Sequence, residues 1–130
     1  MNVKELNRLT EKSIGLAIEI HRELGPGFLE SVYQTAFAFE LERAGILFEK
    51  EKSLPVKYKG IILDIGFRCD FLIEKNIIVE CKAVNEITLI DHAQLLNYLK
   101  ITGLRVGLLI NFNVLLLKKG IKRFVNNLAE

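Results

Sequence analysis

The sequence predicts an α/β protein of the α+β kind, in which helices flank a mixed β-sheet in the order ααβββαβ with a β-rich tail. Three observations predict this fold. Apolar residues recur at helical spacing before Gly45 and again from about Leu89 to Ile101. Between the two helical regions, from Leu47 to Lys82, the period is two. A nearly continuous apolar run, Val106 to Phe112, then indicates a strand covered on both faces.

Two helices are expected before the first strand. Asn2, with Glu5 three residues later, resembles a capping box. The apolar spacing of the first helix ends at the break Gly25-Pro26-Gly27. The second helix follows that break, and Gly45 supplies its expected stop.

The period-two region predicts a three-stranded antiparallel meander. Its strands are 54–58, 61–72 and 77–81, and a Lys59-Gly60 turn joins the first two. After the third helix and the apolar run, segments 114–117 and 121–125 are expected to add one or two edge strands. Because the chain contains no repeat and no linker composition, residues 1–130 are expected to form a single domain.

Composition indicates a globular protein outside the membrane. Half of the residues are hydrophobic and 26% are charged, and no apolar run approaches the roughly 18 residues that span a bilayer. Charged residues interrupt the N-terminal segment, so we expect no signal peptide and a cytoplasmic location. Cys69 and Cys81 are expected to be buried apolar side chains, neighbours across two strands on the face opposite the acids.

Charge alone does not predict a nucleic-acid partner, since the net charge is only +2. Two local groups of basic residues carry more information. One flanks a predicted strand and the other lies near the C-terminus: Lys50, Lys52, Lys57 and Lys59; Lys118, Lys119, Lys122 and Arg123. Either group could follow a phosphate backbone, or could be a solvated strand edge that resists aggregation.

The most informative segment is 68–82. If the chain reverses around Lys75, antiparallel pairing sets Asp70 opposite Glu80, and the period of two places Lys82 on the same face. Opposed carboxylates destabilise a sheet unless a positive charge lies between them. A hard divalent cation such as Mg²⁺ takes oxygen ligands, so this patch predicts a phosphodiester-cleaving site. The alternative is that Lys82 only neutralises one of the two acids.

A third acid, Glu30, lies on the apolar stripe of the second helix, together with Tyr33, Phe37 and Leu41. In one interpretation it reaches the Asp70 and Glu80 patch and joins a metal site, directly or through water. In the other it interacts with the helix dipole from the first turn. The residues alone leave both interpretations open.

On the third helix, Asp91, Gln94 and Tyr98 follow one another at offsets of three and four and so share a face. Gln94 and Tyr98 could position a phosphate or an attacking water, or the three could be a solvated face. The two histidines, His21 and His92, lack metal-ligand spacing and are expected to have packing or hydrogen-bonding roles.

A family resemblance rests on these residues. Segment 27–33 reads Gly-Phe-Leu-Glu-Ser-Val-Tyr and resembles the Gly-x-x-Glu-x-x-Tyr signature of the GxxExxY family, and His21-Arg22-Glu23-Leu24-Gly25-Pro26 leads into it. The resemblance runs from about residue 5 to residue 125. That family is placed among the PD-(D/E)xK nucleases, which implies a restriction-endonuclease-like core. Cys69 stands where the superfamily name places proline.

The resemblance also implies roles for site residues. Asp70 and Glu80 would be ligands of Mg²⁺ or Mn²⁺, Lys82 would orient or polarise the attacking water, and Glu30 would be the helix-borne acid. Gln94 and Tyr98 match a Gln-x-x-x-Tyr element of some nuclease branches.

Two hypotheses about function follow. In the first, the protein is a metal-dependent nuclease acting on DNA, or on RNA, with the backbone carbonyl of Cys81 as a further metal ligand; such a small enzyme could act as a homodimer. In the second, it is a catalytically weak nuclease-fold module that binds nucleic acid or a protein partner. Metal titration discriminates the two.

Overall fold

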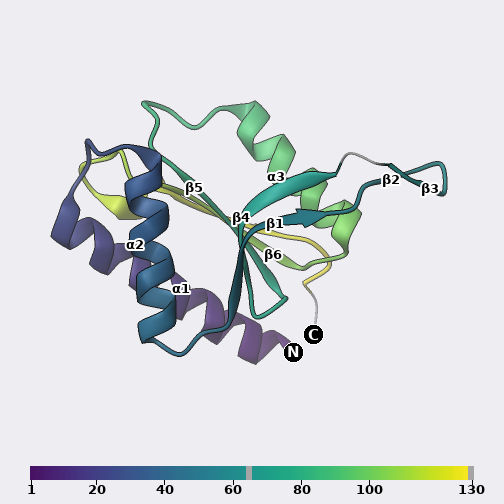
Figure 1. The fold of residues 1–130 in the computed structure, drawn as a ribbon, viewed down its shortest axis with the longest axis horizontal. Helices are drawn as coiled ribbons and strands as arrows, with labels where there is room; N and C mark the ends of the chain where they lie inside the picture. Colours follow the sequence, from purple (N-terminus) through teal and green to yellow (C-terminus); the bar gives the residue numbers. More distant parts are fainter. Residues whose placement is uncertain (64–65, 129–130) are drawn as a thin grey trace.

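The computed structural model describes residues 1–63 and 66–128. The chain forms a mixed α/β fold, as the sequence predicts (Figure 1). In chain order its elements are α1 (Val3–Leu24), α2 (Glu30–Arg43), β1 (Phe48–Leu54), β2 (Lys57–Tyr58), β3 (Ile61–Ile62), β4 (Phe67–Ile73), β5 (Ile77–Lys82), α3 (Leu89–Thr102), β6 (Val106–Asn111), the 3-10 turn η1 (Leu117–Gly120) and β7 (Ile121–Val125).

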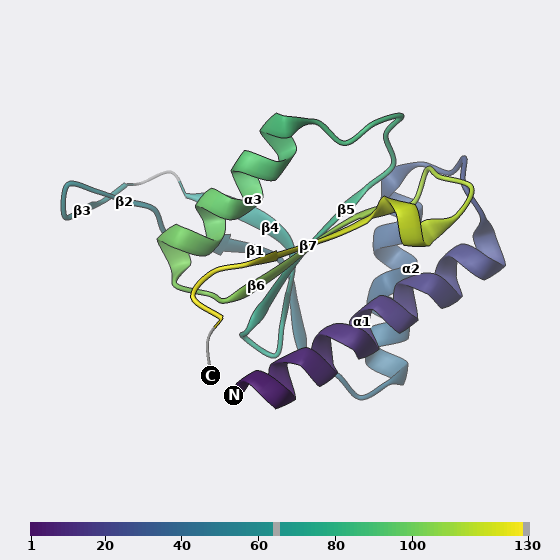
Figure 2. The same cartoon turned by 180° about the vertical axis from the view of Figure 1, so that it is seen from behind.

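A five-stranded sheet with the order β1-β4-β5-β6-β7 forms the centre of the fold. The β5 and β6 strands run parallel, joined by the crossover through α3, and the other neighbours pair antiparallel. The expected mixed sheet is therefore confirmed, and it contains a three-stranded antiparallel meander, β1-β4-β5, whose first two strands have other bounds than expected. Helices α1 and α2 cover one face of the sheet and α3 covers the other (Figures 1 and 2).

Apolar packing on both faces explains the apolar run that the sequence shows from Val106. All six residues of β6 are buried. Leu108 and Ile110 pack into the larger core beneath α1 and α2, whereas Leu109 packs with Leu95 and Leu99 of α3. A strand with an apolar partner on each side needs no polar face, which is why its sequence does not alternate.

Helix ends follow the expected signals. The Asn2 side chain accepts a hydrogen bond from the Glu5 backbone N–H at 2.8 Å, and this caps α1. After α2, Gly45 adopts a left-handed φ of 70°, and the N–H of Ile46 reaches the carbonyl of Leu41 at 3.0 Å. These contacts satisfy backbone groups that a helix end leaves unpaired.

Two predictions about strands are corrected. The first strand begins at Phe48, six residues earlier than expected, and the Lys59-Gly60 turn belongs to the separate hairpin β2–β3. Segment 114–117 does not form the expected edge strand, although 121–125 does. The carbonyl of Val114 is instead taken by His21 Nε2, 2.7 Å away, and the carbonyl of Leu116 begins the η1 turn.

The two cysteines are buried as expected, but they do not share a face of the sheet. Cys69 packs in the α3-side core, whereas Cys81 packs in the core beneath α1 and α2. The alternation of β4 breaks at Asp70, where Glu51 of β1 has a left-handed φ of 54° and the Glu51 to Asp70 pair is missing from the ladder. The register is the same on both sides of this position, so no residue is inserted and the irregularity lies in the backbone conformation alone.

Tyr33 ties the connection between α1 and α2 to the sheet. Its side chain is fully buried, and its ring stacks on Phe112 with centroids 4.6 Å apart. Its hydroxyl donates to the carbonyl of Gly25 at 2.6 Å and accepts from the N–H of Phe28 at 3.2 Å. This tyrosine thereby determines where α2 begins, and Glu30 is the first residue of that helix.

Among the described residues, none of the helices is both long enough and apolar enough to cross a membrane.

We expect Tyr33→Phe to lower the free energy of unfolding by about 1–3 kcal/mol, because it removes two hydrogen bonds to partly buried backbone groups. Urea unfolding monitored by circular dichroism measures the change. Tyr58→Phe is the control. Because the Tyr58 side chain is 58% exposed, its loss of a hydroxyl should change stability by no more than about 0.5 kcal/mol. Equal effects of the two changes would show that the Tyr33 hydroxyl is not a structural tie.

Candidate active site

The predicted hairpin forms in the predicted register. Phe71 pairs with Val79 and Ile73 with Ile77, and this register sets Asp70 opposite Glu80. Glu74 and Lys75 occupy the turn with left-handed φ values of 50° and 59°. Two successive residues of that kind are typical of the type I′ turn, whose twist matches that of the strands it joins.

The ladder between β4 and β5 ends at Phe71 and Val79, and the two strands separate there. Asp70 occupies the position after the last pair. Its Oδ2 accepts a hydrogen bond from the backbone N–H of Cys81 at 2.8 Å. A side-chain carboxylate thus takes the place that a backbone carbonyl would have in a regular ladder. Because the N–H and C=O of one strand residue point to the same side, the Cys81 carbonyl is also directed toward the gap.

Glu80 is the most unusual acid of the site. Within residues 1–63 and 66–128, its Oε1 is the one buried side-chain oxygen or nitrogen that has no hydrogen-bond partner. Burial, followed by the negative charge of Asp70, raises the pKa of Glu80 to about 8. A buried carboxylate oxygen with no donor beside a second carboxylate is a costly arrangement that a bound cation would relieve.

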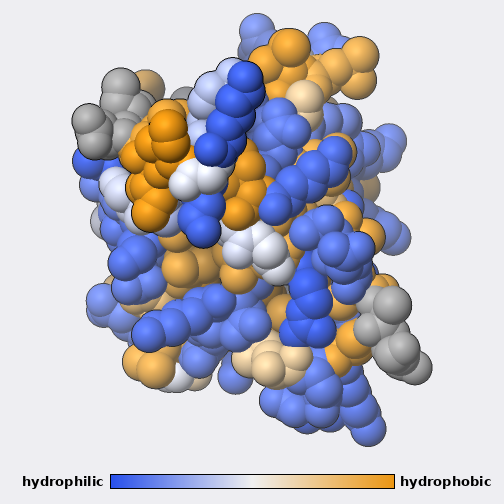
Figure 3. All heavy atoms as spheres, turned by 90° about the vertical axis from the view of Figure 1, so that its right-hand side faces the viewer, coloured by the Kyte–Doolittle hydropathy of each residue, from blue (hydrophilic) through white to orange (hydrophobic). Residues whose placement is uncertain are grey.

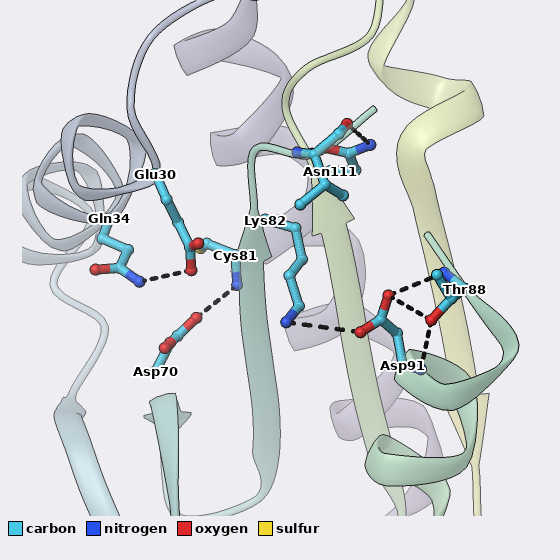
Figure 4. Close-up of polar contacts among 9 residues, drawn as sticks. Glu30, Gln34, Asp70, Cys81, Lys82, Thr88, Asp91 and Asn111 are labelled. Atoms are coloured by element: carbon cyan, nitrogen blue, oxygen red, sulfur yellow. Dashed lines mark hydrogen bonds and ion pairs between the residues drawn. The ribbon is translucent and has the colours of Figure 1, made fainter. Parts of the chain in front are cut away.

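Glu30 approaches the same segment of β5 from the other face of the sheet. Figure 4 shows its carboxylate directed toward Cys81, with Asp70 below it. Glu30 Oε1 accepts from Gln34 Nε2 at 3.2 Å. Partial burial raises the pKa of Glu30, and the charge of Asp70 adds to that effect. Glu30 is therefore close enough to interact electrostatically with Asp70, as one of the two interpretations of the sequence requires.

The three acids do not, however, form one ligand set. In the part of the chain that the structure describes, no three His, Cys, Asp or Glu side chains lie close enough together to hold a metal ion. Glu30 therefore lies outside a close cluster with Asp70 and Glu80, and a role for it in a metal site, directly or through water, stays a prediction. The reason is topological, since Glu30 lies on the α2 side and Glu80 lines a cavity on the α3 side.

Lys82 interacts with Asp91, so the simple alternative of an ion pair with Asp70 or Glu80 is not what the structure shows. Its Nζ lies 3.9 Å from Asp91 Oδ1 (Figure 4). Asp91 is held by Thr88, which caps α3 in a reciprocal capping box, and the hydrogen bond from the Thr88 N–H keeps the pKa of Asp91 below its usual range. Lys82 is thereby directed toward α3 by an acid outside the pair.

A small polar cavity joins the remaining predicted residues. It measures about 120 Å³ and lies between β5 and α3. Its polar lining comes from Arg68, Glu80, Lys82, Asp91, Gln94 and Tyr98. The predicted face of α3 therefore points to the same space as Glu80 and Lys82, which the Gln-x-x-x-Tyr spacing alone could not establish.

Tyr98 is fixed in this cavity by stacking. Its ring lies parallel to that of Phe67, with centroids 3.6 Å apart. Partial burial and the charge of Glu80 raise the pKa of Tyr98, so its hydroxyl stays protonated and can donate a hydrogen bond at neutral pH.

Sequence reasoning missed Asn111, which holds the loop that follows Lys82. The side chain is buried. It accepts from the N–H of Val84 at 3.1 Å and donates to the carbonyl of Val84 at 2.9 Å. The sequence signal that could have identified Asn111 was a polar residue within an apolar run. In the structure its strand pairs parallel with β5, and Asn111 aligns with Lys82.

The thiols do not belong to the chemistry of the site. Burial raises the pKa of Cys69 to about 12 and raises the pKa of Cys81 well above its ordinary value. Neither sulfur is therefore a thiolate at neutral pH, and neither is a nucleophile or a soft metal ligand. At Cys81 the groups that face the site are the backbone N–H and carbonyl, not the sulfur.

The chain is similar to a known family and to a solved structure. The family model of the PD-(D/E)XK nuclease superfamily matches residues 7–124. Among solved structures, the crystal structure of SSO0001 is similar to 77% of this chain, with 21% sequence identity and a TM-score of 0.49. The chain spans 50% of the length of that protein chain. No match was found among curated proteins.

The raised pKa of Glu80 predicts how stability depends on pH. Between its ordinary value of 4.5 and about 8, the folded protein keeps a proton that the unfolded chain has lost. The free energy of unfolding should therefore fall as pH rises through this window, and the loss should be complete above the folded pKa. Glu80→Gln should remove this part of the pH dependence and should stabilise the protein at pH values above the window.

Urea unfolding in metal-free buffer across this pH range measures the effect. Glu42→Gln is the control, because Glu42 is exposed on α2 and makes no side-chain contact with the site in the described part of the chain. If wild type and Glu80→Gln had parallel stability curves, the carboxyl of Glu80 would not be the group that retains the proton.

Proposed function

Because the chain belongs to the PD-(D/E)XK nuclease superfamily, we propose that it is a divalent-metal-dependent nuclease that hydrolyses phosphodiester bonds of DNA, or of RNA. One observation carries the proposal. Glu80 has a buried carboxylate oxygen without a partner, beside Asp70 at the point where β4 and β5 separate. Hard oxygen donors in a polar setting suit Mg²⁺ or Mn²⁺.

Asp70, Glu80 and the backbone carbonyl of Cys81 would hold the ion. The donor chemistry fits, since all three are oxygens and the hydrogen bond from Cys81 fixes one oxygen of Asp70. Glu30, bonded to Gln34, would contact water around the ion. When bound, the metal lowers the pKa of a coordinated water and neutralises charge that develops on the phosphate.

The other residues of the cavity bind and orient. Lys82 holds a fixed positive charge between Asp91 and the acids and would stabilise the negative charge of the transition state. The Tyr98 hydroxyl and the Gln94 amide can donate hydrogen bonds to phosphate oxygens. Asp91 and Asn111 position Lys82 and its loop.

The GxxExxY assignment within the superfamily is part of this proposal. Its support is that the signature residues act in one segment. Tyr33 hydrogen-bonds the loop before α2, and Glu30 is the first residue of that helix. We further propose a single domain over residues 1–130 and a cytoplasmic location, and a homodimer where both strands of a duplex are cut.

A second candidate function is a nuclease-fold module that binds nucleic acid or a protein partner with little catalysis. The observation that favours it is the contact between Lys82 and Asp91. This contact occupies the ammonium that hydrolysis would use. Metal binding and turnover separate the two candidates.

We expect Asp70→Asn, Glu80→Gln and Lys82→Ala each to reduce Mg²⁺-dependent cleavage by about 100-fold or more. The first two changes remove a carboxylate that would hold the metal ion, and the third removes the positive charge that would stabilise the transition state. The substitution to asparagine keeps an oxygen for the Cys81 N–H. Nicking of supercoiled plasmid and cleavage of labelled DNA and RNA strands measure activity. Glu42→Gln should cleave like wild type, and a fully active Asp70→Asn protein would remove Asp70 from the mechanism.

We also expect Mg²⁺ or Mn²⁺ to raise the melting temperature of the wild-type protein, because an ion that binds only the folded state stabilises it by mass action. Asp70→Asn should abolish the increase, whereas Lys82→Ala should retain it. Differential scanning fluorimetry with increasing metal, and calorimetric titration, provide the measurement. An equal thermal response in wild type and Asp70→Asn would place the metal elsewhere and would favour the binding module.

A further inference from the structure

The small hairpin β2–β3 projects from the body of the protein beside the end of α3 (Figures 1 and 2). Its strands pair Lys57 with Ile62 and Tyr58 with Ile61. Lys59 and Gly60 make the turn with left-handed φ values of 49° and 81°. The nuclease chemistry proposed above does not use this element.

The hairpin exposes apolar side chains that a two-stranded ribbon cannot bury by itself. Tyr58, Ile61 and Ile62 are 58%, 64% and 61% exposed, and Leu63 is 41% exposed. Figure 3, which looks onto this side of the molecule, shows hydrophobic side chains gathered among hydrophilic ones. Adjacent exposed apolar residues on a protruding element mark a contact site.

Within residues 57–62 the charged side chains are two lysines. Lys57 and Lys59 are exposed, and neither makes an ion pair with another described residue. The ammonium of Lys59 lies 5.4 Å from the centroid of the Tyr58 ring. The edge strand β1 carries Lys50 and Lys52 together with Glu49 and Glu51, so it adds no net charge.

Strand β4, which follows the hairpin in the chain, leads to the proposed active site. Phe67, the first residue of β4, stacks on Tyr98, and the next residue, Arg68, lines the cavity that contains Glu80 and Lys82. Asp70 follows Phe67 by three residues, about 10 Å along a strand. A ligand that lies along the hairpin base would therefore extend to the acid pair.

We propose that the β2–β3 hairpin is a nucleic-acid-binding element, in which Lys57 and Lys59 contact phosphates while Tyr58 and Ile61 pack against exposed bases. This inference rests on the proposed function, because the strand that the hairpin holds is the substrate of the acid pair. Bases stack on aromatic rings, and apolar wedges enter between them. Lysines beside the ring supply the charge that a phosphate backbone requires.

Charge complementarity favours this ligand over a second copy of the chain. Two hairpins that met tip to tip would bring Lys57 and Lys59 against the same residues of the partner copy, and like charges in a closing interface oppose association. A polyanion with exposed bases satisfies the lysines and the apolar side chains together.

The test measures binding separately from cleavage. Fluorescence anisotropy in EDTA follows wild type and variants with labelled single-stranded DNA, RNA of the same sequence, and duplex DNA, at several salt concentrations. Lys57→Gln/Lys59→Gln should weaken binding about tenfold and lower the slope of log affinity against log salt by about 1.4 for single strands or about 1.8 for duplex DNA. Tyr58→Ser/Ile61→Ser should weaken binding about tenfold with little change in that slope.

Lys118→Gln/Lys119→Gln is the matched control. It removes the same number of charges from η1, at the far end of the molecule from the hairpin (Figure 2), and should bind like wild type. Circular dichroism of each variant checks the fold. Equal weakening by both lysine pairs would show that only total charge matters, and would overturn the inference.

Other outcomes also decide the matter. Wild type that binds none of the three probes, or hairpin variants that bind all of them like wild type, would overturn the inference while leaving the cleavage tests of Asp70 to stand on their own. If Tyr58→Ser/Ile61→Ser instead dissociated a dimer in sedimentation velocity and bound nucleic acid normally, the hairpin would be a self-association site. Hairpin-dependent binding without any cleavage would support the inference and contradict the proposed enzyme.

Discussion

The candidate site depends on two carboxylates that are kept together where a pair of strands separates. Asp70 is held by the N–H of Cys81, Glu80 lines the cavity between β5 and α3, and the two carboxyl groups are close enough for the charge of Asp70 to raise the pKa of Glu80. The protein lowers the repulsion between them by keeping a proton on the pair, which is why the pKa of Glu80 rises to about 8. A cation bound at the pair would lower the same repulsion in place of the proton. The proposed chemistry depends on this replacement of a proton by a metal ion.

The rest of the fold restricts where the site residues can go. Tyr33 connects the α1–α2 loop to Phe112 after β6, Asn111 holds the loop that leaves β5, and Thr88 fixes Asp91 at the start of α3. All three contacts join segments at the end of the parallel pair β5 and β6. In the proposed function, substrate contacts come from Gln94 and Tyr98 in the cavity and, beyond these segments, from the hairpin that lies between β1 and β4 in the chain.

Much of the fold was predictable because local signals and tertiary packing agree. Helical spacing located α1, α2 and α3, and the left-handed glycines after α2 and α3 end those helices as expected. The prediction for segment 114–117 was wrong because its backbone groups are taken by His21 and by a 3-10 turn. Apolar composition alone does not show when a side chain distant in sequence takes the backbone hydrogen bonds that a strand would need.

The sequence by itself determined the register of the β4–β5 hairpin, since the turn at Glu74-Lys75 and the period of two leave one pairing that buries the apolar residues. It therefore predicted that Asp70 and Glu80 lie opposite each other, one step beyond the last ladder pair, Phe71 with Val79. Only the tertiary structure decided the surroundings of that pair: the break in the alternation of β4 that places Cys69 on the α3 side, the position of Glu30 on the α2 side, and the attraction of Lys82 to Asp91. These depend on how helices pack across the sheet, and no periodicity within one strand encodes that packing.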